Sequence, residues 1–255
     1  MLFKIATLGS KSIIETKKYY RNEYIYEVII QEGVEVIGGG AFSECSGISE
    51  FRLPNTLTEI GRYAFNGCSG LTNLRLPSTL TKIGSYAFGG CSELTSLGLP
   101  DTLTEIRDGT FSYCSGIIDL RLPDTLTKIG DDAFLSCLGL TELSLPDTLT
   151  EIGNCAFYEC ISLEVIYCSD KIAKLLTEDV ISGSKYSVEE MRQRADPKVY
   201  LNRFYWNPGN NHKSFKYLND TIKTLFLCTL RNDLTKFLPD MPEEMYRKIL
   251  SMIRC

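Results

Sequence analysis

Ten cysteines and one histidine are the residues of this 255-residue sequence that could support nucleophilic or metal-binding chemistry. Six of the cysteines recur with a period of 23 residues: Cys45, Cys68, Cys91, Cys114, Cys137 and Cys160. Zinc ligands come as close pairs, and a disulfide needs two sulfurs in contact, so one cysteine per period suits neither. We interpret the six as a reduced, buried column of small apolar side chains.

A catalytic Ser–His–Asp or Cys–His arrangement would have to use His212, which lies in a polar stretch beside Asn211 and Lys213. The three glycines at 38–40 do not form a phosphate-binding loop, because no Lys-Ser/Thr follows them. No pair of carboxylates stands out from ordinary surface acids. The sequence therefore predicts a non-enzymatic protein with no cofactor and no metal ion.

A 23-residue repeat positions the cysteines, with the unit I-G-x-x-A-F-x-x-C-x-x-L-x-x-L-x-L-P-x-x-L-x-x. It runs six times over residues 37–174 without insertion or deletion. A fixed period of this length is typical of a solenoid, in which each coil contacts only its neighbours. The sequence predicts a leucine-rich-repeat solenoid, mainly β with short turns and 3-10 segments, with a small α-helical cap at its C-terminal end.

Each apolar position of the repeat has an expected place in the coil. Leu71, Leu74 and Leu76 should form a short strand that faces inward, and Ile83 should cover the opposite wall. Phe88 should supply the largest buried side chain, which stabilises by roughly 1.5–3 kcal/mol. The repeat glycine should mark a turn that needs either positive φ or close backbone approach. Arg107 replaces this glycine in one coil.

Two columns of outward side chains carry charge. One alternates in sign from coil to coil: Glu59, Lys82, Glu105, Lys128, Glu151 and Lys174. Since coils stack about 4.8 Å apart, each of these charges should have two opposite neighbours, at a modest gain in stability. The other column lies between the inward strand residues and forms a candidate partner-binding face, which comprises Glu50, Arg52, Asn73, Arg75, Asp119, Arg121, Glu142 and Tyr167.

The arginines of this face have two interpretations. They could form a docking stripe for a partner, or they could be solvated strand residues that pair with neighbouring acids such as Glu50 and Asp119. The sequence leaves both open. Solenoids usually bind their partners on the exposed face of this sheet.

The pattern L-x-L-P-x-x-L-x-x-I-G-x-x-A-F-x-x-C resembles the BspA-like class of leucine-rich repeats, and residues 76–91 match it position by position. The resemblance covers about 27–174. It implies the solenoid fold and a role in protein binding, since members include bacterial surface adhesins and intracellular proteins. It implies no catalytic residues.

Both ends of the chain depart from the repeat. Residues 1–36 are expected to form a degenerate N-terminal capping repeat, with Ile14, Tyr19 and Asn22 at the isoleucine, phenylalanine and cysteine positions. Residues 175–255 are expected to form a helical region in which residues 187–190 make a capping box. Its last helix should present one apolar face, made of Met245, Ile249, Met252 and Ile253.

This last face could either cap the solenoid or bind a partner. The segment from Leu225 to Leu250 looks like the opening of an F-box and is loosely similar to a SOCS-box. That resemblance implies recruitment of a ubiquitin-ligase core subunit. The main functional hypothesis is a protein-binding scaffold, and the alternatives are an F-box-like substrate adaptor and a structural subunit of a larger assembly.

The overall charge is unevenly spread. Residues 1–174 carry 14 Lys or Arg against 22 Asp or Glu, and residues 175–255 carry 13 against 10. This distribution gives no basic footprint for duplex nucleic acid. The N-terminus is too interrupted for a signal peptide, and no window reaches the roughly 18 apolar residues of a spanning helix. We therefore expect a soluble cytoplasmic protein that does not insert into membranes.

Overall fold

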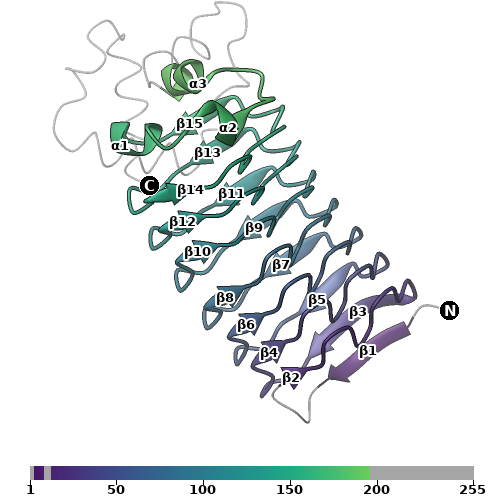
Figure 1. Cartoon of the computed structure of the whole chain (residues 1–255). Coiled ribbons are helices and arrows are strands. Elements are labelled where there is room, and N and C mark those ends of the chain that lie inside the picture. Colours follow the sequence, from purple (N-terminus) through teal and green to yellow (C-terminus); the bar gives the residue numbers. More distant parts are fainter. Residues whose placement is uncertain (1–2, 9–12, 196–255) are drawn as a thin grey trace, which may run out of the picture. The chain divides into compact units, whose positions relative to one another are not determined.

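A computed structural model describes residues 3–8 and 13–195 of the chain, which form a solenoid of short parallel strands (Figure 1). Successive coils are offset by 23 residues, so each strand pairs with its equivalent one repeat away. Each coil contributes one strand to each of two walls, and hydrogen-bonded turns form a third. The predicted fold class is confirmed.

The first wall carries the longer strands. A six-stranded parallel sheet contains, in spatial order, β1 (Phe3–Leu8), β3 (Ile25–Ile30), β5 (Glu50–Arg52), β7 (Asn73–Arg75), β9 (Ser96–Gly98) and β11 (Asp119–Arg121). The next two strands, β13 (Glu142–Ser144) and β15 (Val165–Tyr167), form a separate pair. In β5, β7, β9 and β11 only the central residue is buried, as expected for strands with one face on the core.

The second wall consists of two-residue strands, which the sequence analysis did not identify as strands. Four of them form one sheet: β2 (Ile13–Ile14), β4 (Val36–Ile37), β6 (Glu59–Ile60) and β8 (Lys82–Ile83). The other three form a second sheet: β10 (Glu105–Ile106), β12 (Lys128–Ile129) and β14 (Glu151–Ile152). The repeat isoleucines of these strands are buried in the core, except for partly buried Ile152, which confirms the predicted position of Ile83.

The third wall, which we call the phenylalanine wall, is continuous along the coils. The backbone N–H of each repeat phenylalanine donates a hydrogen bond to a carbonyl of the following coil, from Phe42 to Ala64 at 2.8 Å through Phe88 to Thr110 at 2.9 Å. The series ends with Phe157, which donates to the carbonyl of Val180 at 2.8 Å. Within each coil, the remaining turns close through bonds from an N–H to the carbonyl three residues earlier.

The phenylalanine side chains stack behind this wall and form the centre of the core. Adjacent rings from Phe42 to Phe157 lie 5.1–5.6 Å apart between centroids. Tyr19 extends the stack toward the N-terminus, with its ring 5.2 Å from that of Phe42. The proposed alignment of the upstream segment is therefore confirmed at this position. The domain boundaries themselves, at 36/37 and 174/175, stay a prediction.

The cysteine column lies beside the phenylalanine stack and is buried and unpaired by disulfides, as expected. Cys45 donates to the carbonyl of Tyr19, and each later thiol donates to that of the repeat phenylalanine one coil earlier, such as Cys68 to Phe42 at 3.2 Å and Cys114 to Phe88 at 3.1 Å. A small side chain with a weak donor suits this narrow space.

The repeat glycines are required by close approach of neighbouring coils. A Cβ atom added to Gly84 would lie 2.4 Å from the backbone nitrogen of Arg62. The left-handed backbone conformation occurs two positions later instead, where the residue need not be glycine, as at Tyr86 with φ of 57°. Of the two explanations that the sequence left open, the structure therefore supports close approach.

Three short helices follow the last coil: α1 (Asp170–Ala173), α2 (Glu178–Ile181) and α3 (Val188–Ala195). Buried Ile172, Val180 and Met191 belong to the same hydrophobic core as the coils. The predicted capping box is confirmed, since the backbone N–H of Glu190 donates to Ser187 Oγ and the N–H of Ser187 donates to the Glu190 carboxylate. His212 and the predicted helix with Met245, Ile249, Met252 and Ile253 lie outside the described residues.

Candidate functional site

The exposed side chains of β5, β7, β9, β11 and β13 project from the first wall, and we call this surface the sheet face. The alternation of each strand places two outward side chains per coil, one on either side of a buried residue such as Leu74 or Leu120. The structure therefore brings the predicted residues of the face together as two parallel rows. The balance between basic and acidic side chains on this face changes from one coil to the next along the solenoid.

Arg52, at the N-terminal part of the sheet face, is neutralised by two carboxylates. Its guanidinium lies 3.8 Å from Glu27 Oε1 and 3.9 Å from Glu50 Oε2. Glu27 comes from β3, one coil before the first residue predicted for the face, and is largely buried. The register of β3 with β5, which pairs Glu27 with Glu50, is the signal that could have identified it.

Arg75 and Arg121 have a different environment. Both are exposed, and Gly98 of β9 pairs with Arg75 on one side and with Arg121 on the other. No carboxylate of the described chain forms an ion pair with either arginine. A Cβ atom added to Gly98 would meet nothing within 4 Å, so the surface between the two arginines is open.

Toward its C-terminal end the sheet face carries two acids, Asp119 on β11 and Glu142 on β13. Burial, followed by the nearby charge of Asp119, raises the pKa of the Glu142 carboxyl. These two acids occupy equivalent positions of β11 and β13, and this is the step at which the first-wall sheet is interrupted. Like charges on neighbouring strands repel each other, so these two acids weaken this step of the face. Tyr167, the last predicted residue of the face, is half-buried at the end of β15.

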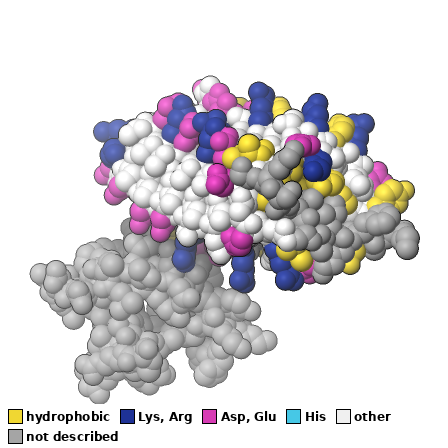
Figure 2. Space-filling view, turned by 90° about the horizontal axis from the view of Figure 1, so that it is seen from below, with side chains coloured by type: hydrophobic (Ala, Val, Ile, Leu, Met, Phe, Trp, Pro, Cys, Tyr) yellow, Lys and Arg dark blue, Asp and Glu magenta, His cyan; other side chains and the backbone are white. Residues whose placement is uncertain are grey.

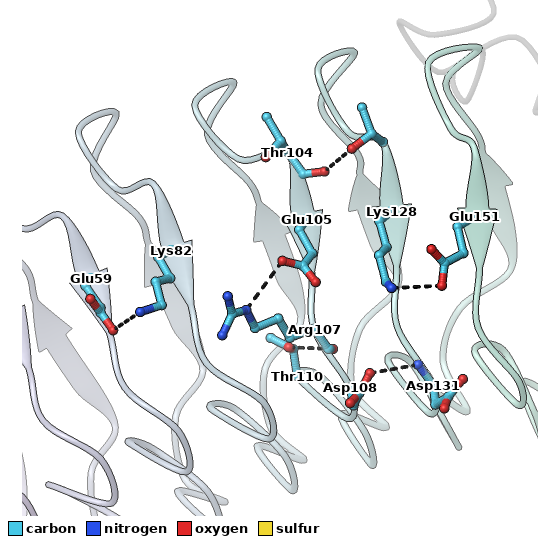
Figure 3. A network of polar contacts seen from close by, with 11 residues as sticks. Glu59, Lys82, Thr104, Glu105, Arg107, Asp108, Thr110, Lys128, Asp131 and Glu151 are labelled. Carbon is cyan, nitrogen blue, oxygen red and sulfur yellow. Dashed lines mark hydrogen bonds and ion pairs between the residues drawn. The ribbon is translucent and has the colours of Figure 1, made fainter.

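The alternating charges of the second wall have the predicted two opposite neighbours at Lys128, whose pKa is raised by its hydrogen bond to Glu151 and also by the charge of Glu105. The predicted alternation is broken between Lys82 and Glu105. Lys82 Nζ lies 2.6 Å from Glu59 Oε1, and Lys128 Nζ lies 2.8 Å from Glu151 Oε1. Glu105 instead contacts Arg107 of its own coil, at 3.5 Å between Oε2 and Nε. Figure 3 shows the Arg107 side chain lying between Lys82 and Glu105, with no contact drawn between those two residues.

Arg107 explains why the second wall is interrupted between β8 and β10. At the equivalent position the glycine nitrogen donates to the preceding coil, from Gly84 to Ile60 and from Gly130 to Ile106, each at 2.8 Å. The contacts of Gly84 show that any Cβ there would collide with backbone of the preceding coil. An arginine therefore holds the two coils apart, and the described backbone has no such bond from Arg107.

The thiols are poorly suited to chemistry. Burial raises the pKa of the Cys160 thiol to about 12 and also raises the pKa of the Cys68 thiol. The thiolate is the form of cysteine that acts as a nucleophile or metal ligand. Burial and a raised pKa both keep these two thiols from reacting at neutral pH. Within residues 3–8 and 13–195, no three His, Cys, Asp or Glu side chains gather as a metal site would require.

Exposed hydrophobic side chains also occur at the N-terminal end of the solenoid. Ile13, Tyr20 and Tyr24 are 53%, 45% and 60% exposed, which is unusual for large apolar residues. Figure 2 shows hydrophobic side chains gathered at that end, whereas basic and acidic side chains intermix along the rest of the visible surface. In the part of the chain that the structure describes, no helix is long and apolar enough to cross a membrane.

The repeat pattern matches a known family model, the BspA type leucine rich repeat region, in six copies over residues 12–138 and 104–178. The chain belongs to the BspA-type leucine-rich repeat family. The match does not extend to the tail, so it gives no support to the F-box resemblance. No curated protein matches the chain significantly.

Solved structures of bacterial proteins share the fold. A leucine rich cell surface protein from Faecalibacterium prausnitzii is 33% identical with a TM-score of 0.57, and the match covers 64% of this chain and 46% of that protein. A leucine-rich repeat protein of T. pallidum is 28% identical with a TM-score of 0.59, over 66% of this chain and 78% of that one. The chain thus spans less than half of the F. prausnitzii protein.

Proposed function

We propose that this BspA-type solenoid is a non-catalytic scaffold that binds a protein partner on its sheet face. Leucine-rich repeat domains generally mediate protein interactions, and the repeat family is the coarse evidence for this role. The observation that carries the proposal is the composition of the sheet face. Arg75 and Arg121 are exposed and lack ion-pair partners among the described residues, so the face offers charge that the described solenoid does not itself balance.

The rest of the described surface offers weaker grounds for a binding site. On the second wall, Lys82 and Lys128 are engaged by Glu59 and Glu151. Surface ion pairs of this kind fix register and solubility more than they attract a partner. Arg75 and Arg121 also lie on strands of one hydrogen-bonded sheet, which holds their backbones in a fixed register for binding.

Charge reversal tests the location of the binding site. The variant Arg52→Glu/Arg75→Glu/Arg121→Glu should lose a stoichiometric protein partner that wild-type protein retains in affinity purification from its native cells. The matched control reverses the same number of charges at exposed positions off the sheet face: Lys18→Glu/Arg62→Glu/Lys185→Glu. Circular dichroism should show that both variants stay folded. Equal retention of the partner by both variants would move the site away from the sheet face.

The adaptor and structural-subunit hypotheses stay predictions, as does the cytoplasmic location. The adaptor hypothesis depends on Met245, Ile249, Met252 and Ile253, which lie outside the described residues. Cell fractionation would test the location, and the F. prausnitzii relative, described as a cell surface protein, makes the outer surface the alternative to compare.

A further inference from the structure

We propose that Arg75 and Arg121 together bind one carboxylate group of an acidic protein segment, above the gap that Gly98 leaves between them. This inference rests on the proposed function, and it names the chemistry that the sheet face recognises. It also divides the predicted arginine column into two residues that bind the partner and one, Arg52, that pairs with acids of the solenoid itself.

The strand register places the two arginines for a shared ligand. They flank Gly98 on adjacent strands, so their backbones are two strand spacings apart, or about 10 Å. Arginine side chains are long enough to lean toward each other over a glycine. Because an added Cβ at Gly98 would meet nothing within 4 Å, a ligand group can enter between them without displacing protein atoms.

The balance of charge selects Arg75 and Arg121 over Arg52. Glu50 reaches Arg52 two residues along the same strand, at 3.9 Å. Asp119 has the same relation to Arg121 but a side chain shorter by one methylene group, and the described structure contains no ion pair between them. An unpaired guanidinium presents a planar fork that matches a carboxylate, and two such forks give a strong, specific contact.

The neighbouring acids limit how large the ligand's negative charge can be. Asp119 and Glu142 lie on the next two coils of the same face, and their proximity contributes to the raised pKa of Glu142. A long polyanion laid along the face would be repelled there. A single glutamate or aspartate side chain of a protein segment gains the attraction of both arginines and meets the repulsion of Asp119 alone, because it does not extend to Glu142.

A random dodecapeptide library displayed on phage provides the probe, with the full-length chain as bait. Selected peptides should contain aspartate or glutamate. The synthesised peptides should bind Arg75→Ala/Arg121→Ala more than about tenfold more weakly than wild type, because charge-assisted hydrogen bonds are lost. The matched control Arg52→Ala, which removes an arginine of the same column, should change affinity by less than about threefold.

Gly98→Leu tests the gap separately, because it keeps both arginines and fills the space between them. The open surroundings of Gly98 indicate that the variant will fold, and circular dichroism checks this. Its peptide affinity should fall as far as that of the double alanine variant. Unchanged affinity in both variants, with binding still abolished by the triple charge reversal, would overturn the shared-carboxylate inference alone. Failure to select any peptide, or peptides that the triple reversal retains, would overturn the proposed function as well.

Discussion

At the scale of residues, the packing of each repeat cysteine explains why these thiols are unreactive. Each thiol lies against the phenylalanine stack and donates to a carbonyl of the preceding coil, as Cys91 does to Phe65 at 3.4 Å. Any larger side chain would push the coils apart, and a charged one would be buried without a partner. The sequence alone could predict this role, because one cysteine per period excludes paired ligands.

Thiol labelling tests this arrangement. In native protein at pH 8, Ellman's reagent should leave the six repeat cysteines unmodified for as long as the protein stays folded, because they are buried and inaccessible to the reagent. Partly exposed Cys155 and Cys168 should be the first of the described cysteines to react. All ten cysteines should react in guanidinium chloride. Rapid native modification of Cys91, identified by peptide mapping, would contradict the packed column.

Glu142 should make stability depend on pH. Its pKa is raised above the ordinary value of 4.5, so the folded state holds the proton more tightly than the unfolded state does. The free energy of unfolding therefore falls as pH rises from 4.5 through the folded pKa. Glu142→Gln should raise it at pH 7, by up to about 1 kcal/mol, and the gain should disappear below pH 4.5 in urea titrations. Glu93→Gln, at an exposed turn, is the control.

At the scale of elements, the two-residue strands of the second wall depend on how closely the coils approach. Sequence patterns cannot reveal such strands, since an alternation cannot be read from two residues. The Arg107 replacement was visible in the sequence, but its effect depended on whether the repeat glycine served positive φ or close approach. The pair of Arg52 with Glu50 was one of the two interpretations open from the sequence, whereas the contact with Glu27 of the degenerate upstream coil was not predicted.

Two glycine substitutions can distinguish a steric clash between neighbouring coils from the general effect of replacing a flexible glycine. Gly84→Ala should destabilise the protein by more than about 1 kcal/mol, because its Cβ would lie 2.4 Å from backbone that cannot move alone. Gly98→Ala, on a strand with open surroundings, should change stability by less than about 0.5 kcal/mol. Denaturant titration of both variants provides the comparison. Equal effects would show that coil approach is not the constraint.

Hydrogen exchange should directly detect the interruption of the second wall between β8 and β10. Amides of residues 104–107 should exchange faster than those of 127–130, which keep bonds such as Gly130 to Ile106. Arg107→Gly should slow exchange at 104–107, because it restores the glycine on which the other coils rely. Mass spectrometry of peptic fragments can follow both segments in one sample. Equal rates in the wild type would contradict the open step.

At the scale of the whole solenoid, stability is a sum of interactions between neighbouring coils. Phe88→Ala removes a fully buried ring with a partner on each side and should cost about 3–5 kcal/mol. Ile161→Ala removes an exposed side chain and is the control. Urea unfolding followed by circular dichroism measures both. A loss below about 1 kcal/mol for Phe88→Ala would show that the stack contributes little.

The three walls also determine how the rod would carry a mechanical load. The first wall is interrupted between β11 and β13, the second is interrupted earlier along the chain, between β8 and β10, and the phenylalanine wall is continuous past both. Bending that opens either interruption stretches no ladder hydrogen bond on that wall, so the rod is compliant there and stiff elsewhere. At both interruptions, the phenylalanine wall keeps its hydrogen bonds between coils. Tension applied along the axis therefore passes through this wall along the whole series of coils.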